Sequence, residues 1–113
     1  MKINKTVVIG SGTMGSGIAA QLCNANIPVT LLDLKTEISE KAKKKIFDSR
    51  PPLLIDKSKI INIKAGNIEE NFDLVKEADW IVEAVVERID IKHNLYEKIL
   101  KTRKKDSIVS SNT

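Results

Sequence analysis

The sequence predicts an α/β domain with a doubly wound, mainly parallel sheet and helices on both faces, and two observations carry this prediction. Short apolar runs alternate along the chain with longer stretches whose apolar residues recur at helical spacing. The first apolar run, Thr6–Ile9, leads directly into the glycine pattern Gly10-Ser11-Gly12-Thr13-Met14-Gly15, which opens a helix. Strands that are separated by helices pair in parallel, because the crossover helices cover the faces of the sheet.

The glycine pattern is specific because of its surroundings. A G-x-G-x-x-G run between a strand and a helix is typical of dinucleotide binding when an acidic residue ends the next strand. Gly10 permits a tight turn, Gly12 lets the backbone approach a pyrophosphate, and Gly15 allows the helix to pack closely on the strand. Unpaired N–H groups near Thr13 and Met14 lie at the positive end of the helix dipole and attract phosphate. The alternative is a glycine-rich turn that binds no ligand.

Asp33 is the acidic residue that this pattern requires. It ends the second apolar run and follows the glycine pattern at the expected distance. Its carboxylate can accept hydrogen bonds from a ribose hydroxyl and would repel a 2′-phosphate. The sequence therefore predicts NAD rather than NADP as the cofactor, although Lys35 lies close enough to weaken that preference.

Four further elements are predicted in the first half of the chain: a helix and a strand up to Asp33, and a helix and a strand after it. The first helix has an apolar face made of Ile18, Ala19, Leu22 and Ala25. Pro28 marks the passage into the strand Val29–Asp33. A second helix begins near Thr36 and ends before Arg50, with an apolar stripe made of Ile38, Ala42 and Ile46. A half-exposed strand over Ile60–Ala65 is expected to end at Gly66-Asn67.

The second half repeats the alternation. A short helix over Phe72–Ala78 precedes the strongly apolar run Trp80–Val86, which we expect to be a central strand. A helix follows over Asp90–Lys104, with an inward face made of Ile91, Leu95, Ile99 and Leu100. Ser107–Ser110 forms one more strand.

Length and composition place the chain among globular proteins. Its 113 residues are expected to form a single domain over residues 1–113. Apolar residues make up 42% and charged residues 30%, and no apolar run is long enough to span a membrane or to serve as a secretory signal. Cys23 is the only cysteine, which excludes an internal disulfide and a multi-thiolate metal site. We therefore expect a cytoplasmic protein without a metal.

Basic residues gather in two short stretches of a chain whose formal net charge is +4. The stretches consist of Lys41, Lys43, Lys44 and Lys45, and of Lys101, Arg103, Lys104 and Lys105. Such stretches can attract nucleic acid or another anionic partner, but they are more often solvated helix faces. We favour the solvated face, because aromatic residues for base stacking are nearly absent.

Ligands of parallel sheets bind beyond the carboxyl ends of the strands. The segments that should meet there are the glycine pattern, Asp33, the region from Val86 to Lys92, and Ser110–Thr113. Glu87 and Lys92 flank the start of a helix, where a carboxylate and an ammonium could hold ribose hydroxyls. From spacing alone they could equally be surface charges.

Taken together, these motifs resemble the NAD-binding domain of the L-3-hydroxyacyl-CoA dehydrogenases, which has a Rossmann-type fold. The resemblance covers nearly the whole chain and rests on Gly10–Ala19, Asp33, Asp79–Glu87, Ile91-Lys92 and Ser111-Asn112-Thr113. It implies that NAD lies across the glycine loop, that Asp33 binds the adenosine ribose, and that Glu87 and Lys92 contact the cofactor. Pro51-Pro52 and Ala78-Asp79-Trp80 look most like the larger bacterial fatty-acid oxidation enzymes that also carry an enoyl-CoA hydratase.

The resemblance also implies a reaction, the oxidation of the 3-hydroxyl of an acyl-CoA. A histidine paired with a glutamate removes the hydroxyl proton while hydride passes to the nicotinamide. In relatives these two residues, a substrate-side serine and a helical dimerisation domain follow the position of Thr113, so we expect this chain to be truncated relative to the family and inactive alone. His93 matches no catalytic position and is expected to face solvent. Ser49 and Lys44 or Lys45 fall where relatives contact the CoA moiety, and they stay unassigned.

Three hypotheses follow from the sequence. The first is the NAD-binding part of a 3-hydroxyacyl-CoA dehydrogenase, which meets its acyl-CoA substrate only together with the missing part. The second is a stand-alone or remnant module that binds NAD without catalysis, and the third is a lysine-rich binder of nucleic acid or an acidic partner. We also expect the isolated chain to self-associate or to pair with a complementary fragment, because uncovered strand edges and apolar patches promote pairing.

Overall fold

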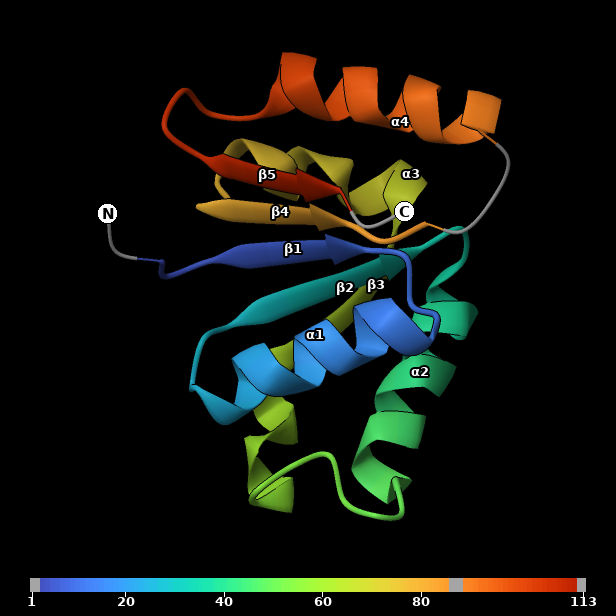
Figure 1. Cartoon of the computed structure of the whole chain (residues 1–113), viewed down its shortest axis with the longest axis vertical. Helices are drawn as coiled ribbons and strands as arrows, with labels where there is room; N and C mark the ends of the chain where they lie inside the picture. The colour runs from blue at the N-terminus through green and yellow to red at the C-terminus, as the bar shows by residue number, and fades with distance from the viewer. Residues whose placement is uncertain (1–2, 86–88, 112–113) are drawn as a thin grey trace.

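The computed structural model describes residues 3–85 and 89–111, which form one parallel sheet flanked by helices (Figure 1). The strands are β1 (Thr6–Ile9), β2 (Val29–Asp33), β3 (Ile63–Asn67), β4 (Trp80–Glu83) and β5 (Ile108–Ser111). Their order in the sheet is β3-β2-β1-β4-β5, and every neighbouring pair is parallel. The chain starts in the middle of the sheet and winds first to one side and then to the other, which confirms the predicted doubly wound fold.

Helices cover both faces of this sheet. α1 (Thr13–Asn24) and α2 (Thr36–Asp48) lie on one face, and α4 (Ile89–Thr102) lies on the other (Figure 1). The connection from β3 to β4 adds α3 (Ile68–Asn71) and the 3-10 helix η2 (Phe72–Lys76), whose apolar residues pack in the same core as α4. A further 3-10 helix, η1 (Lys57–Asn62), leads into β3. No helix in the described part of the chain is both long enough and apolar enough to cross a membrane.

Each face of the sheet has its own core, because successive residues of a strand point to opposite faces. Val8 of β1 belongs to the core under α1 and α2, and its neighbours Val7 and Ile9 belong to the core under α4. The helices contribute fully buried residues such as Ile46 of α2 and Ile99 of α4. Complete burial of one such side chain stabilises the fold by about 1.5–3 kcal/mol.

Most of the residues that we predicted to face inward are buried, namely Ala19, Leu22, Ala42, Ile46, Leu95 and Ile99. Three predictions of this kind are wrong. Ala25 is exposed because it lies at the end of α1, where it acts as the C-cap, and Leu100 is exposed on the outer side of α4. Ile38 of α2 is 42% exposed because it borders a cavity instead of the core.

The segment that precedes β3 differs from the predicted strand over Ile60–Ala65. Its first part is η1, which begins because the Asp56 carboxylate accepts a hydrogen bond from Ser58 N at 3.0 Å. The strand begins only at Ile63, and it runs through Gly66, which we expected to end it. A Cβ atom on Gly66 would lie 2.5 Å from a side-chain oxygen of α3, so the close approach of that helix explains the glycine.

Two other boundaries also differ from prediction. The helix predicted over Phe72–Ala78 is the 3-10 helix η2, which ends at Lys76. It is preceded directly by α3, which the sequence did not predict and which begins where the Asn67 side chain accepts a hydrogen bond from Glu70 N at 2.7 Å. The strand predicted to reach Val86 pairs with its neighbours only as far as Glu83, and Val86 lies outside the described residues.

Candidate nucleotide-binding site

The glycine loop lies at the carboxyl end of β1, in the middle of the sheet, and its backbone is enclosed on two sides. Gly10 has a φ of +106°, and a Cβ atom there would lie 2.7 Å from the carbonyl group of Ala84. A Cβ atom on Gly15 would lie 1.8 Å from the Gly10 carbonyl oxygen. Side chains therefore do not fit at either position, and the structural roles predicted for these two glycines are confirmed.

Gly12 and the start of α1 face open space instead. A Cβ atom on Gly12 would meet no atom within 4 Å. Gly12 is the N-cap of α1, its helix end has no side-chain cap, and the first turn carries no acidic residue. Thr13 and Met14 are exposed, and the first bond into the helix runs from Ser16 N to Gly12 O at 2.9 Å. An uncapped helix N-terminus of this kind is a binding position for an anion.

Asp33 lies beside this loop at the carboxyl end of β2. Its Oδ2 accepts hydrogen bonds from Ser11 N at 2.9 Å and from the Ser11 hydroxyl, and its Oδ1 accepts one from Leu34 N at 2.7 Å. The structure therefore brings Asp33 and the glycine loop together, and the Ser11 side chain orients the carboxylate. An ionised carboxylate has about four acceptor positions, so acceptor capacity remains for a ribose hydroxyl.

A cavity of about 440 Å³ opens between the glycine loop and Asp33. We call it the nucleotide cavity, and it is lined by Gly10, Ser11, Gly12, Asp33, Leu34, Ile38, Ile68, Ala84, Val85 and Leu95. Its walls are mostly apolar, with one carboxylate at the side, which suits a flat base joined to a polar sugar. Sequence reasoning missed the wall residues Leu34, Ile38, Ile68 and Val85, because an apolar residue that borders a cavity has the same spacing as one in the core.

A second hollow of about 430 Å³ lies on the other side of the loop, between α1 and α2. Its lining includes Lys41, Lys45 and Ser49 together with Ser11 and Thr13. Of the residues that the sequence left unassigned, Lys45 and Ser49 border this hollow. With Ser16, which also lines it, the hollow carries two ammonium groups and four hydroxyls next to the N-terminus of α1.

The two charged residues predicted after β4 have different outcomes. Glu87 lies outside the described residues. Lys92 lies in the first half of α4, and its Nζ is 3.8 Å from the Glu83 carboxylate at the end of β4. The adjacent residue His93 is exposed, as predicted, so this histidine faces solvent.

Glu83 is a residue at this edge that sequence reasoning missed. Its Oε2 accepts a hydrogen bond from Val85 N at 2.6 Å, and its Oε1 accepts one from the Ser111 hydroxyl at 2.7 Å. The side chain is buried. A glutamate inside a strongly apolar run was the available signal, because buried charges in proteins are almost always paired.

The two basic stretches have different surroundings. Lys41, Lys44 and Lys45 of the first stretch are exposed along α2, as predicted for a solvated face. In the second stretch the Lys104 side chain is 38% exposed, and its ammonium also pairs with Asp79 just before β4. This pairing, together with hydrogen bonds from the backbone N–H groups of two residues before β1, lowers the pKa of Asp79 to about 2.

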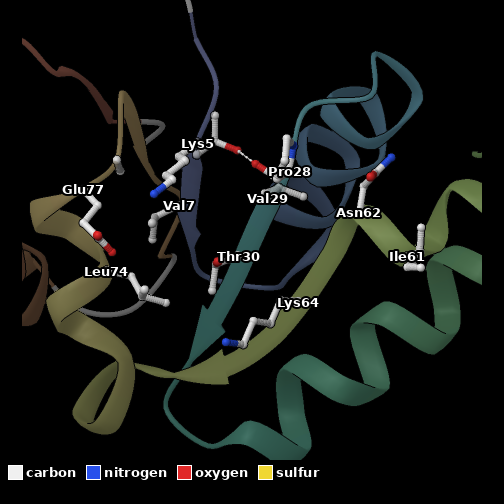
Figure 2. Close-up of a pocket in the computed structure, with 12 residues that line it drawn as sticks. Lys5, Val7, Pro28, Val29, Thr30, Ile61, Asn62, Lys64, Leu74 and Glu77 are labelled. Atoms are coloured by element: carbon white, nitrogen blue, oxygen red, sulfur yellow. Dashed lines mark hydrogen bonds between the residues drawn. The ribbon is translucent and has the colours of Figure 1, made fainter.

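Another cavity, of about 410 Å³, lies at the opposite edge of the sheet. Figure 2 places its lining at the amino ends of β1 and β2, with Lys5, Pro28 and Thr30 among the labelled residues. The Thr6 hydroxyl donates a hydrogen bond to the Pro28 carbonyl oxygen there, at 3.0 Å. This cavity shares no lining residue with the nucleotide cavity, because parallel strands place all their carboxyl ends at the other edge.

Comparison with known proteins agrees with this geometry. Residues 5–113 match the family described as "3-hydroxyacyl-CoA dehydrogenase, NAD binding domain". Among relatives, the chain is 41% identical over its full length to a protein of Deinococcus radiodurans named "Probable 3-hydroxyacyl-CoA dehydrogenase", of which it spans 35%. It is 35% identical to a peroxisomal fatty acid beta-oxidation multifunctional protein of Arabidopsis thaliana, with 98% of this chain and 16% of that protein covered.

Solved structures give the same result. The crystal structure of (S)-3-hydroxybutyryl-CoA dehydrogenase from Ralstonia eutropha superposes with a TM-score of 0.84 and 26% identity, over 99% of this chain and 41% of that one. The 3-hydroxybutyryl-CoA dehydrogenase of Escherichia coli K12 gives a TM-score of 0.83 and 25% identity, over 100% of this chain and 25% of that one. The chain thus spans less than half of each of these proteins, and it belongs to the family of NAD-binding domains of the 3-hydroxyacyl-CoA dehydrogenases.

Proposed function

We propose that this chain binds NAD(H) through the glycine loop, the N-terminus of α1 and Asp33, with the adenosine in the nucleotide cavity. The observation that carries the proposal is the open backbone at Gly12. It lies at an uncapped helix N-terminus and borders the nucleotide cavity together with the Asp33 carboxylate. The helix N-terminus suits the pyrophosphate, the Asp33 carboxylate suits the ribose, and the mostly apolar cavity suits the base.

Replacement of Gly12 by alanine tests this proposal, and Gly17→Ala is the matched control. Neither new methyl group would meet an atom within 4 Å, so both variants are expected to fold. In Gly12→Ala the methyl group would stand where the phosphates approach the backbone, and we expect NADH affinity to fall by about tenfold or more. Gly17 lies further along α1 and does not border the nucleotide cavity, so its variant should bind NADH as the wild type does.

Calorimetric titration with NADH is the measurement, with urea unfolding of each variant alongside. Equal NADH affinities of wild type and Gly12→Ala, in folded proteins, would refute the proposed position of the pyrophosphate. Absence of NADH binding by the folded wild type would refute the proposal as a whole and would favour a remnant without a ligand.

The preference for NAD over NADP rests on the Asp33 carboxylate. A 2′-phosphate placed against this negative charge would be repelled. We expect the wild type to bind NADH more tightly than NADPH, and Asp33→Asn to narrow the difference because it removes the charge and keeps the side-chain shape. The ratio of the two dissociation constants, measured at one salt concentration, tests this expectation. A wild type that binds NADPH as tightly as NADH would contradict it.

We further propose that the whole protein oxidises L-3-hydroxyacyl-CoA to 3-oxoacyl-CoA with NAD. Membership of the family supports this reaction. The hollow that holds Lys41, Lys45 and Ser49 also supports it, because ammonium and hydroxyl groups suit the phosphates of coenzyme A. The one histidine of the chain, His93, is exposed on α4 and lines neither the nucleotide cavity nor this hollow, so we do not assign it as the base. NADH formation from 3-hydroxybutyryl-CoA should therefore be absent with this chain alone and should require the remaining part of such a dehydrogenase.

We propose a cytoplasmic location and self-association of the isolated chain. A single, fully buried cysteine supports a reducing compartment. The position of β5 at the end of the sheet supports self-association, because within residues 3–85 and 89–111 this strand pairs only with β4, and its Ile108 is 44% exposed. Sedimentation velocity over a concentration range tests the second proposal. A monomer at every concentration would contradict it.

A further inference from the structure

Glu83 is a carboxylate at a position where the sheet offers apolar surroundings. It is the last residue of β4, an interior strand, and only 1% of it is exposed. The two preceding residues, Ile81 and Val82, are apolar and fully buried. Burial of an ionised carboxylate is unfavourable unless the charge is paired and hydrogen-bonded. A valine here would avoid that cost, so the glutamate calls for a functional reason.

The partners of Glu83 come from three different segments at the ligand edge of the sheet. Oε2 accepts a hydrogen bond from Val85 N at 2.6 Å and lies 3.8 Å from Lys92 Nζ. Oε1 accepts a hydrogen bond from the Ser111 hydroxyl at 2.7 Å. The Lys92 side chain is itself only 12% exposed. One carboxylate therefore joins the turn after β4, the first half of α4 and the end of β5.

Two of these segments form walls of the nucleotide cavity. Val85 lines the cavity, and so does Leu95, which lies about one helical turn after Lys92. The glycine loop also depends on this turn, because Gly10 packs against the backbone of Ala84. A displacement of the turn after β4 would therefore change the cavity wall and the glycine loop together.

We propose that Glu83 is a positioning residue for the bound dinucleotide. Its negative charge holds the Lys92 ammonium at the ligand edge, and its Oε2 fixes the backbone of Val85. Glu83 acts through these two residues and makes no contact of its own with the ligand. This inference rests on the proposed NAD(H) site and on the expectation from the sequence that Lys92 contacts the dinucleotide.

A double-mutant cycle in NADH affinity separates positioning from a structural role. Glu83→Gln keeps the side-chain volume and an acceptor oxygen for Val85 N, and it removes the charge that faces Lys92. Lys92→Met keeps the length of the stem and removes the ammonium. We expect each single variant to bind NADH about tenfold more weakly than the wild type, and the double variant to bind no more weakly than Lys92→Met. Glu77→Gln, at an exposed residue of the opposite edge, should bind NADH as the wild type does.

The outcomes are distinct, provided that urea unfolding confirms that each variant is folded. Single-variant losses that multiply in the double variant would overturn the inference, because Glu83→Gln keeps the acceptor for Val85 N and its missing charge should have no effect once the Lys92 ammonium is gone. Wild-type NADH affinity in Glu83→Gln would overturn it as well, with the proposed function intact. A wild type that does not bind NADH would instead refute the proposed function. If Glu83→Gln does not fold, Ser111→Ala takes its place in the cycle. We expect Ser111→Ala to weaken NADH binding threefold or more in the wild-type background and to have no effect in the Lys92→Met background. Unchanged NADH affinity of the single variant Ser111→Ala would overturn the inference.

Discussion

Alanine at Gly15 should destabilise the fold strongly, whereas alanine at Gly17, two residues further along α1, should stabilise it. At Gly15 the new methyl carbon would lie 1.8 Å from the Gly10 carbonyl oxygen, and real contacts of this kind are essentially never below 3.0 Å. One of the two backbones must therefore move by more than 1 Å. Gly10 cannot yield easily, because its other side faces the backbone of Ala84 and its N–H donates to the Leu32 carbonyl at 2.8 Å.

The two effects can be given magnitudes. Overpacking of a close contact typically costs about 1–3 kcal/mol, and a clash with fixed backbone belongs at or above the upper end, so we expect Gly15→Ala to lose roughly 3 kcal/mol. At Gly17 a methyl group would meet no atom within 4 Å. There the change removes only the conformational entropy cost of a glycine inside a helix, and the gain is about 0.5–1 kcal/mol. The two variants should therefore differ by roughly 4 kcal/mol, against a total stability of about 5–15 kcal/mol for an ordinary domain.

Equilibrium unfolding in urea, followed by circular dichroism, measures this difference. With an m-value of about 1.5 kcal/mol/M, a loss of 3 kcal/mol lowers the midpoint by about 2 M. Gly17→Ala controls for alanine itself, because it makes the same chemical change in the same helix. A Gly15→Ala midpoint within about 0.3 M of the wild type, or a Gly17→Ala midpoint that falls by a similar amount to that of Gly15→Ala, would refute the reasoning.

Three further predictions follow from individual contacts. Ser11→Ala removes the hydroxyl that donates to Asp33 Oδ2 and leaves the carboxylate less well oriented, so NADH affinity should fall by about three- to tenfold in a calorimetric titration, and tighter binding would contradict this. The pKa of Asp79 is lowered from 3.8 to about 2 in the folded chain, so its contribution to stability is present above pH 4 and is lost as the pH falls toward 2. Over this pH range the melting temperature of Asp79→Asn should fall less than that of the wild type, and equal falls would count against the role of Asp79. Cys23 is fully buried, and this burial raises the pKa of its thiol. A disulfide reagent at pH 8 should therefore label Cys23 only at the rate at which the chain unfolds, and rapid labelling of the native chain would be inconsistent with the structure.

The glycine loop and Asp33 could be predicted from sequence because their roles depend on local backbone geometry at fixed spacing. Gly10 and Gly15 contact each other within one turn, and Asp33 reaches Ser11 because consecutive strands of this fold lie side by side. The strand before Gly66 was placed wrongly for the opposite reason. Its boundary is set by a cap at Asp56 and by pairing with β2, neither of which changes the apolar alternation that the prediction used.

The residues that line the nucleotide cavity could not be predicted, because they depend on where the helices leave part of the sheet uncovered in the folded chain. Ile38 continues the apolar stripe of α2, yet it borders the nucleotide cavity while Ile46, two turns later, is buried. The contact between Glu83 and Ser111 could not be predicted either. They are 28 residues apart, and only the pairing of β4 with β5 brings their side chains together. A single sequence carries no signal for a contact of that range.

Three acidic residues at strand ends illustrate how strand direction decides the role of a charge. Asp79 precedes β4, so it lies at the amino edge, where backbone N–H groups and Lys104 occupy its carboxylate. Asp33 follows β2, so it lies at the carboxyl edge, where its partners are neutral groups of the glycine loop and of Leu34, and it borders a cavity. Glu83 shares the carboxyl edge with Asp33 but is buried beneath α4, and its charge is directed at Lys92 instead of the cavity. In this sheet, therefore, the strand end at which an acidic residue lies decides whether it is on the side of the nucleotide cavity, and the direction of its side chain distinguishes Asp33, which borders the cavity, from Glu83, which faces Lys92.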